Sequence, residues 1–366
     1  LQLLGIKEAI QGGGVRIDGT IGNPTYLAIY LTLIIGISFI LFFNSTKLWQ
    51  KRFYLGSALF LIFIMFFTAS RGAAVAWAIT LPIFLILYLS IFRNEAKEKI
   101  FKRIAAIILA AIVIIPILFL LIKNQNWVKE HPVLSRFANL SLSEQTVRSR
   151  FFMWGIGIQG FLERPILGWG QENFIQVFSK HFHPGLYDQE PWFDRAHNII
   201  FDWLNNAGIL GLLSYLALFA TYFVVVIKGY RQKIIESKEW LVLLILPITY
   251  FIQNLFVFDN FNTYLVFFTL LAYVNSWEVP SSESRKSERQ INAPNTSFSL
   301  IVLIVGFLAT CFILYFTAIK PIAQARAIIS GLSATASSED PVGKTLEAFD
   351  KALSYNTFGN ATQHFA

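Results

Sequence analysis

The sequence predicts an all-α protein, a polytopic bundle of transmembrane helices. Hydrophobic residues make up 55% of the 366-residue chain and charged residues only 14%, a composition that excludes an ordinary soluble globular protein. Apolar segments long enough to cross a bilayer as helices recur along the chain, since a span needs about 20 such residues. The longest polar interruption, from about 123 to 206, separates two of these segments. We therefore expect a membrane bundle with a long outer loop of interfacial helices, followed by a C-terminal helical-repeat fragment.

Residues 1–23 are rich in glycine and end in the turn-like Gly22-Asn23-Pro24, which predicts an outer-face loop entering the membrane. The chain opens on Leu-Gln without a signal-peptide pattern, so we interpret it as a fragment that lacks earlier spans. The membrane domain is predicted to cover 24–319. Its spans are expected near 25–43, 53–69, 73–92, 104–122, 207–227, 240–257, 261–275 and 298–319.

Loop charges set the predicted orientation, because Lys and Arg are retained on the cytoplasmic side of a membrane. Cations gather in every second loop: Lys47, Lys51 and Arg52; Arg93, Lys97, Lys99, Lys102 and Arg103; Lys228, Arg231, Lys233 and Lys238; Arg285, Lys286 and Arg289. The remaining loops, with the 123–206 loop and everything after about 320, are then predicted to face outward. This distribution also accounts for most of the net charge of +8, so no nucleic-acid partner is predicted.

Within the outer loop, Arg148 to Leu162 has helical apolar spacing and is predicted to lie along the interface until Pro165 stops it. A second short helix is expected from about 171 to 178. A further helix carries Phe201 to Leu204, capped by Asp194 or Asn198, and runs through Gly208 into the next span. His197 would stand at the start of that helix, where unpaired backbone N–H groups favour anions.

Several cations fall on the predicted outer face, against the usual bias: Arg16, Arg71, Arg148, Arg150, Arg195 and His197. One explanation is snorkelling, in which a long cationic side chain near the end of a span reaches the lipid phosphates. For Arg71, Arg150 and His197 together, the shared face and the surrounding motifs favour a functional cluster.

Residues 320–366 return to ordinary surface polarity with Ala-rich helical periodicity. The pattern EAFDKALSYNTFGNA resembles the second helix of a tetratricopeptide repeat. One such unit cannot bury its own face, so further repeats and a protein partner bound through them are expected. The single cysteine, Cys311, lies in an apolar run, which leaves neither an intrachain disulfide nor a thiolate metal site.

Four segments occur in a characteristic order: DGTIGNPTYLA at 18–28, TASRGAAVAWAI at 68–79, RFFMWGIGIQGFLERPILGWGQENF at 150–174 and DRAHNIIFDWLNNAGILGLL at 194–213. With them the chain resembles the O-antigen ligase and polymerase superfamily of bacterial membrane glycosyltransferases over roughly residues 15–275. That superfamily includes lipopolysaccharide O-antigen ligases, O-antigen polymerases and protein O-oligosaccharyltransferases.

The resemblance implies a C-type glycosyltransferase-like fold in the bacterial cytoplasmic (inner) membrane. It implies transfer of a glycan from an undecaprenyl-diphosphate carrier to an acceptor hydroxyl on the outer, periplasmic face, among membrane lipids and without a metal or other cofactor. Arg71 matches the family's arginine in the short outer turn, Arg150 the one before the interfacial helix, and His197 the histidine of the Ala-His-Asn motif. These three are the predicted catalytic residues. Six more are predicted to bind substrate: Arg16, Arg148, Arg195, Asn198, Asp194 and Trp154.

The chemistry explains these residue types. A diphosphate leaves readily only when its developing charge is stabilised, and guanidinium groups provide paired, permanently charged donors. The acceptor hydroxyl is a poor nucleophile, and histidine is the side chain whose ordinary pKa suits a base near neutrality. His197 as base and His197 as a donor to the phosphate stay as alternatives. Asp194 either orients the imidazole or caps the helix.

Other interpretations use the same residues. The acceptor is a lipid core, a second lipid-linked glycan or a protein, and the motifs do not separate these. A catalytic metal held by His181, His183 and His197 with Asp188 or Glu190 lacks a tight ligand signature. A transporter of an anionic solute would spread charges through its spans rather than gather them at one face. A pure scaffold for the repeats leaves the arginines unexplained. Aromatic rings in the loop fit an interfacial belt or sugar stacking: Trp154, Trp169, Trp192 and Trp203.

Overall fold

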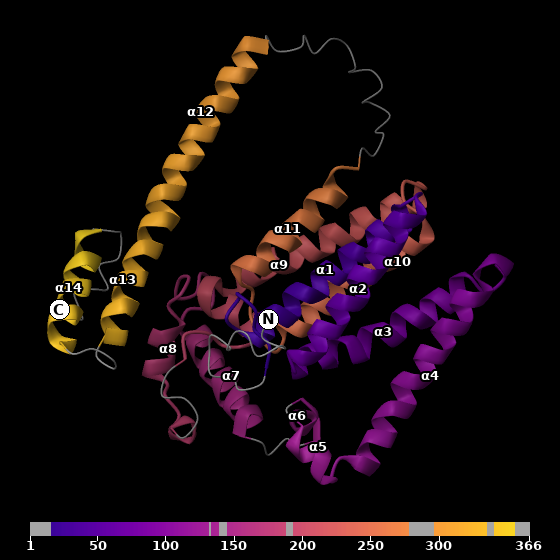
Figure 1. The fold of residues 1–366 in the computed structure, drawn as a ribbon, viewed down its shortest axis with the longest axis horizontal. Helices are drawn as coiled ribbons and strands as arrows, with labels where there is room; N and C mark the ends of the chain where they lie inside the picture. Colours follow the sequence, from indigo (N-terminus) through magenta and orange to yellow (C-terminus); the bar gives the residue numbers. More distant parts are fainter. Residues whose placement is uncertain are drawn as a thin grey trace. The chain divides into compact units, whose positions relative to one another are not determined.

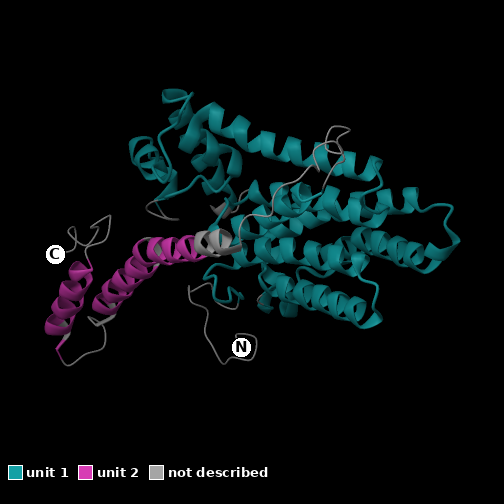
Figure 2. Cartoon of the chain, turned by 90° about the horizontal axis from the view of Figure 1, so that it is seen from above, with its two compact units in different colours: residues 1–279 teal, residues 280–366 magenta. Residues whose placement is uncertain are grey.

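A computed structural model describes residues 16–131, 133–138, 145–187, 193–277, 296–334 and 340–355. The chain forms two compact units, residues 1–279 and residues 280–366 (Figure 2). All regular structure in the described ranges is helical (Figure 1). Five of these helices are long and apolar enough to cross a membrane. The predicted all-α, polytopic fold class is confirmed.

Each predicted span coincides with a helix. The helices are α1 (Pro24–Asn44), α2 (Leu48–Phe67), α3 (Arg71–Ile91), α4 (Lys99–Ile122), α9 (Ile199–Arg231), α10 (Ser237–Asn254), α11 (Phe261–Asn275) and α12 (Thr296–Leu314). Helix α9 contains both the helix predicted at 201–204 and the following span, and the predicted continuity through Gly208 is confirmed, with a kink at that glycine. Helix α12 is shorter and passes at Tyr315 into a π-helix.

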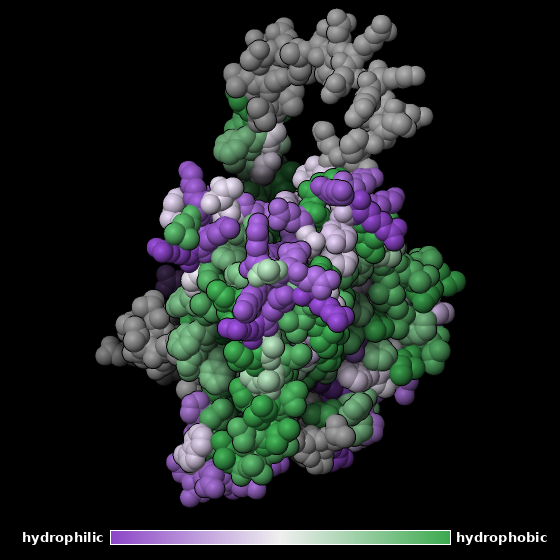
Figure 3. Space-filling model, turned by 90° about the vertical axis from the view of Figure 1, so that its right-hand side faces the viewer, coloured by the Kyte–Doolittle hydropathy of each residue, from purple (hydrophilic) through white to green (hydrophobic). Residues whose placement is uncertain are grey.

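Helix α1 is the centre of the first unit and packs against α2, α3, α10 and α11. Its residues Ile29, Leu33 and Ile35 are fully buried. In contrast, α2 and α4 each bury a single residue among those described, Ala58 and Ala105. Their other apolar side chains are exposed in long rows, which is typical of helices that face lipid. Figure 3 shows hydrophilic side chains in patches on a face that is otherwise largely hydrophobic.

One ion-pair cluster ties two of the loops predicted to be cytoplasmic. Glu98, in the short 3-10 turn Ala96–Glu98, accepts hydrogen bonds of 2.6 Å from both Lys238 Nζ and Tyr88 Oη. The α3–α4 connection is thereby joined to the start of α10. Loops that the charge pattern assigns to one side of the membrane do meet in the fold.

The described part of the segment between α4 and α9 contains four α-helices: α5 (Asn126–Glu130), α6 (Leu134–Ala138), α7 (Gln145–Glu163) and α8 (Phe174–Lys180). Helix α7 matches the helix predicted from Arg148 to Leu162, whereas α8 begins and ends slightly later than expected. Neither α5 nor α6 was predicted, because five-residue helices carry too little periodicity. Apolar residues of α7 and α8 form a separate small core with the start of α9, including Met153, Ile156, Phe174, Val177 and Phe178.

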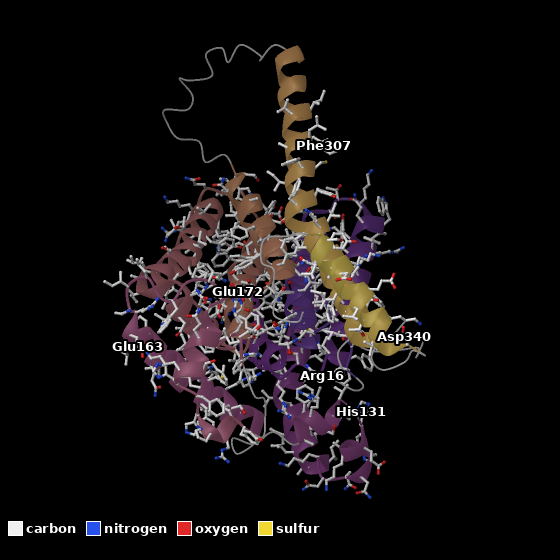
Figure 4. All side chains as sticks on the ribbon, turned by 90° about the vertical axis from the view of Figure 1, so that its left-hand side faces the viewer. Arg16, His131, Glu163, Glu172, Phe307 and Asp340 are labelled. Carbon is white, nitrogen blue, oxygen red and sulfur yellow. The ribbon has the colours of Figure 1, made fainter. Side chains whose placement is uncertain are left out.

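The second unit contains α12, the π-helix Tyr315–Ile319, α13 (Lys320–Ala334) and α14 (Pro341–Ser354). Helices α13 and α14 pack together as a hairpin. Asp340, labelled in Figure 4, caps α14 by accepting a 3.0 Å hydrogen bond from Gly343 N. The helical character predicted for this region is confirmed in α13 and α14. Its kinship to tetratricopeptide repeats, and the predicted division of the chain at residue 320, stay predictions.

Candidate active site

The turn between α2 and α3 presents Arg71. Thr68 Oγ1 donates a 2.7 Å hydrogen bond to the Met65 carbonyl at the end of α2, and Ala69 takes a left-handed conformation with φ of 47°. Ser70 then leads into α3, whose first residue is Arg71. A Cβ on Gly72 would lie 3.0 Å from Phe256 Cβ, so glycine permits this close approach. Arg71 therefore stands at the positive end of the α3 dipole.

Three arginines gather around this turn. Arg16 Nε donates to the Thr68 carbonyl at 2.9 Å, and Arg71 Nε donates to the Arg136 carbonyl at 3.0 Å. Burial, followed by the charges of Arg136 and Arg71, lowers the pKa of Arg16 to about 10. We call Arg16, Arg71 and Arg136 the arginine cluster. Guanidinium groups gathered in this way are suited to bind the phosphates of a multivalent anion.

Arg136 is a site residue that sequence reasoning missed. It belongs to the five-residue helix α6, which hydropathy does not reveal. The available signal was another cation in the predicted outer loop. The hydrogen bond to Arg71 shows that α6 lies against the start of α3.

His197 lies in the loop before α9 in a left-handed conformation with φ of 52°. Its Nδ1 is 3.1 Å from the Arg195 carbonyl, and the rings of Phe193 and Phe258 pack edge-on at 5.6 and 5.3 Å between centroids. Since a carbonyl only accepts hydrogen bonds, Nδ1 carries the proton of the neutral ring. The lone pair is then on Nε2, so the predicted base has its accepting nitrogen available for a substrate.

Burial, with added contributions from the positive charges of Arg150 and Arg195, lowers the pKa of His197 below its ordinary value. The backbone hydrogen bond and Asp194 oppose this shift but do not reverse it. The imidazole is therefore neutral at pH 7. The contribution of Arg150 shows that this α7 residue lies close enough to His197 for its charge to lower the pKa of the imidazole.

The other predicted residues of α7 differ in exposure. Trp154 stacks on Phe201 with ring centroids 5.8 Å apart, and its buried indole N–H finds no hydrogen-bond partner among the described residues. Arg148 is exposed. Trp154 thus faces α9.

Asp194 and Asn198 were both considered as the cap of the following helix. Asn198 is the cap: its Oδ1 accepts a 2.9 Å hydrogen bond from Ile200 N at the start of α9. Asp194 is exposed, and its charge acts on His197. Asp194 therefore affects the site through its charge, which raises the pKa of the His197 imidazole.

Arg195 holds the histidine loop in place. It forms a two-point salt bridge with Asp202, with Nε–Oδ1 and Nη2–Oδ2 distances of 2.8 and 2.7 Å. Its Nη1 donates to Glu172, labelled in Figure 4, at 2.6 Å. The guanidinium also lies 4.5 Å from the centre of the Phe258 ring. Because protein groups engage all three nitrogens, the geometry favours a positioning role for Arg195 over direct contact with substrate.

The α10–α11 loop, Leu255–Asn260, lies between the arginine cluster and the histidine. Phe256 packs on Gly72 beside Arg71, and Phe258 packs on His197 and Arg195. Asp259 anchors the loop by accepting hydrogen bonds from Tyr250 and from Asn254 Nδ2, and burial raises its pKa to about 6. The structure thus brings Arg150 to His197 and Arg71 to Arg16 and Arg136, as two groups flanking one loop.

A kink in α9 positions α7 relative to the histidine. Gly208 has a left-handed φ of 64°, which interrupts the helix. Backbone groups near the kink instead form hydrogen bonds with the turn after α7. Trp169 N donates to Asn205 O at 2.7 Å, Gly170 N to Asn206 O at 3.0 Å, and Ile209 N to Pro165 O at 2.8 Å. The turn that begins at Pro165, the predicted end of the interfacial helix, therefore also docks α7 on α9.

Two of the histidines that were considered as metal ligands, His181 and His183, contact other side chains instead. No group of three His, Cys, Asp or Glu side chains that could hold a metal occurs within the described ranges. His181 contacts Glu163 at 2.9 Å, and His183 stacks on Phe152. Asp188, Glu190 and Trp192 lie outside the described residues, as do the cations predicted inside at 285–289.

Two tryptophans of the predicted aromatic belt pack within the protein. Trp169 lies under Arg164, 4.2 Å from ring centre to guanidinium, and its Nε1 donates to the Gly160 carbonyl at 2.8 Å. Trp203 stacks on Tyr215 with centroids 5.1 Å apart. Both rings therefore have packing contacts within the protein that do not depend on sugar or lipid binding.

Fold and site together define a class: a polytopic membrane protein that gathers arginines and a neutral histidine at one end of its helices. Residues 56–216 match the family model described as O-antigen ligase, which supports the O-antigen ligase and polymerase superfamily for this part of the chain. No curated protein matches the chain. The matched region contains Arg71, Arg136, Arg150 and His197, whereas Arg16 and the Leu255–Asn260 loop lie outside it.

The family makes this chain a membrane glycosyltransferase of the ligase and polymerase type. With its apolar helices, it is a multi-pass protein of the bacterial inner membrane. Its substrates are a lipid-linked glycan donor and an acceptor.

Proposed function

We propose that this protein transfers a glycan from an undecaprenyl-diphosphate carrier to an acceptor hydroxyl at the periplasmic face of the inner membrane, without a metal ion. The observation that carries the proposal is a half-buried imidazole, oriented by the Arg195 carbonyl and within electrostatic reach of Arg150, one loop away from the arginine cluster. A base and a diphosphate site are the two components that such a transfer needs.

In the proposed step, the acceptor oxygen attacks the anomeric carbon of the glycan. The bond from that carbon to the diphosphate oxygen breaks, and the diphosphate leaves with the electron pair. The hydroxyl proton passes to Nε2 of His197, which the Arg195 carbonyl orients through Nδ1. Arg150 and the arginine cluster stabilise the charge that develops on the leaving diphosphate. In the alternative, His197 donates a hydrogen bond to the phosphate and no proton is abstracted.

The family match favours this transferase over the transporter of an anionic solute. The acceptor is a lipid core, a second lipid-linked glycan or a protein. The α13–α14 hairpin is the segment that we propose contacts a protein partner or the acceptor, since stacked helical hairpins form concave binding surfaces.

The test measures glycan transfer by the full chain in membranes, from an undecaprenyl-diphosphate-linked glycan and with EDTA present. We expect His197→Ala and Arg150→Ala each to reduce transfer by about 100-fold or more. The matched control is Arg164→Ala, which removes an exposed arginine of the same outer segment that stacks on Trp169.

Folded His197→Ala and Arg150→Ala proteins with full transfer would show that the site is assigned wrongly. Loss of wild-type transfer in EDTA, with recovery on adding a divalent cation, would contradict the metal-free mechanism. Absence of transfer from any lipid-diphosphate donor would favour the hypothesis that the protein transports an anionic solute.

A further inference from the structure

An apolar pocket adjoins the arginine cluster. It has a volume of about 230 Å³ and is lined by Ile62, Met65 and Phe66 of α2, Ala73 and Ala74 of α3, and Phe137 of α6. Ser70, at the turn, completes the wall. The pocket thus lies where the end of α2, the start of α3 and α6 come together.

The pocket and the cluster are formed by neighbouring residues of the same segments, although no arginine lines the pocket. Arg71 stands between the lining residues Ser70 and Ala73, and Arg136 directly precedes Phe137. The hydrogen bond from Arg71 Nε to the Arg136 carbonyl holds α6 against the start of α3. A ligand whose phosphates meet the cluster therefore has an apolar cavity immediately beside its charged end.

The pocket also borders the lipid-facing surface. Phe66 is 48% exposed, and the neighbouring Leu59 and Phe63 of α2 are 58% and 53% exposed. These side chains form an apolar row along a helix that buries only Ala58 among its residues. Hydrocarbon in the bilayer can therefore continue into the pocket without crossing a polar surface.

We infer that this pocket binds the first isoprene units of the carrier lipid while the arginine cluster binds its diphosphate, which makes Arg136 and Phe137 substrate-binding residues. The inference rests on the proposed function. In an isoprenyl diphosphate the phosphate is bonded directly to branched hydrocarbon, as the adjacency of cluster and pocket requires. A phospholipid instead separates its phosphate from its acyl chains by a glycerol ester, and a soluble diphosphate has nothing to fill the pocket.

Because the isoprenyl chain is already in hydrocarbon, the pocket contributes through packing and position rather than through removal from water. The pocket exists because the side chains of Ala73 and Ala74 are small, and Phe137 forms part of its wall. A larger side chain at position 74 is therefore expected to displace the lipid but not the diphosphate.

The test uses the full chain in phosphatidylcholine nanodiscs and measures equilibrium binding of farnesyl diphosphate and of inorganic pyrophosphate. Ala74→Phe should weaken farnesyl diphosphate at least tenfold and leave pyrophosphate unchanged. The control Val75→Phe enlarges the next residue, which is 40% exposed and does not line the pocket, and should alter neither. Arg136→Gln should weaken both probes. Phe137→Ala, which enlarges the pocket instead of filling it, should also weaken farnesyl diphosphate selectively.

Equal effects of Ala74→Phe and Val75→Phe, or wild-type affinities for the two probes that do not differ, would overturn the pocket assignment. So would full displacement of farnesyl diphosphate in nanodiscs containing phosphatidylglycerol, because the pocket would then take an anionic phospholipid. These outcomes are separable from the transfer assay. Selective farnesyl diphosphate binding without any glycan transfer would support the pocket and refute the proposed function.

Discussion

The tautomer and charge of His197 follow from three kinds of neighbour. The Arg195 carbonyl places the proton on Nδ1, the rings of Phe193 and Phe258 desolvate the imidazole, and Arg150 adds a positive charge nearby. The desolvation and the charge of Arg150 outweigh the opposing effect of the carbonyl hydrogen bond on the pKa, so Nε2 is deprotonated at neutral pH. Geometry and charge are therefore consistent with the base role that we propose for His197.

The pH profile of kcat tests that role. The active form of a base is the neutral imidazole, and burial lowers its pKa below the ordinary value of about 6.5. Transfer should therefore be constant above pH 6.5 and fall as the pH drops through the lowered pKa. A His197 that acts as a charged donor to the phosphate would give the opposite slope, with transfer falling as the pH rises.

Asp259 is the control for this profile, because its pKa of about 6 falls in the same range. In Asp259→Asn the acidic fall in kcat should persist if His197 causes it. Its disappearance in that variant would assign the pH dependence to the Leu255–Asn260 loop instead.

At the scale of elements, the site depends on how the turn after α7 docks on the kinked α9. A Cβ at Gly208 would lie 2.2 Å from the Ile166 carbonyl oxygen, and one at Gly168 would lie 2.5 Å from the Asn205 carbonyl oxygen. Two glycines from separate motifs thus permit one backbone contact. That contact sets the distance between Arg150 on α7 and His197 before α9.

Gly208→Ala should lower the free energy of unfolding by about 2 kcal/mol or more, because a left-handed φ and a backbone collision act together. It should also reduce transfer, since α7 loses its docking. The matched control is Gly155→Ala on α7, where a Cβ meets nothing within 4 Å and where stability should stay equal or rise by up to about 1 kcal/mol. Thermal unfolding of both variants measures the difference, and equal stability would refute the docking argument.

At the scale of the whole molecule, the proposed reaction requires the site and the cation-rich loops to lie on opposite sides of the membrane. Glu95 belongs to the connection that Glu98 ties to α10, and Leu167 belongs to the turn docked on α9. Both are exposed, Leu167 by 72%. They are therefore suitable reporters for the two faces.

In a Cys311→Ala background, a membrane-impermeant maleimide applied to intact cells should label Leu167→Cys and leave Glu95→Cys unlabelled. Permeabilisation should make Glu95→Cys reactive, which controls for its exposure. The reverse pattern would place the arginine cluster and His197 in the cytoplasm and refute the proposed periplasmic reaction.

Much of this protein was determined by the sequence alone. The span helices, helix α7, the restriction of the α9 cap to Asp194 or Asn198, and the match to the O-antigen ligase family all follow from it. Apolar run length, cap chemistry and motif order are properties of short stretches, so they can be recognised without knowing what packs against them.

Only the tertiary structure decided which charges meet. It joined Arg136 to Arg16 and Arg71, locked Arg195 between Asp202 and Glu172, and set the Leu255–Asn260 loop between the two parts of the site. Every outward-facing arginine looks alike in a hydropathy pattern, since that pattern records the side of the membrane and not the neighbours. Proximity depends on how helices far apart in the chain pack, and packing is a property of the whole fold.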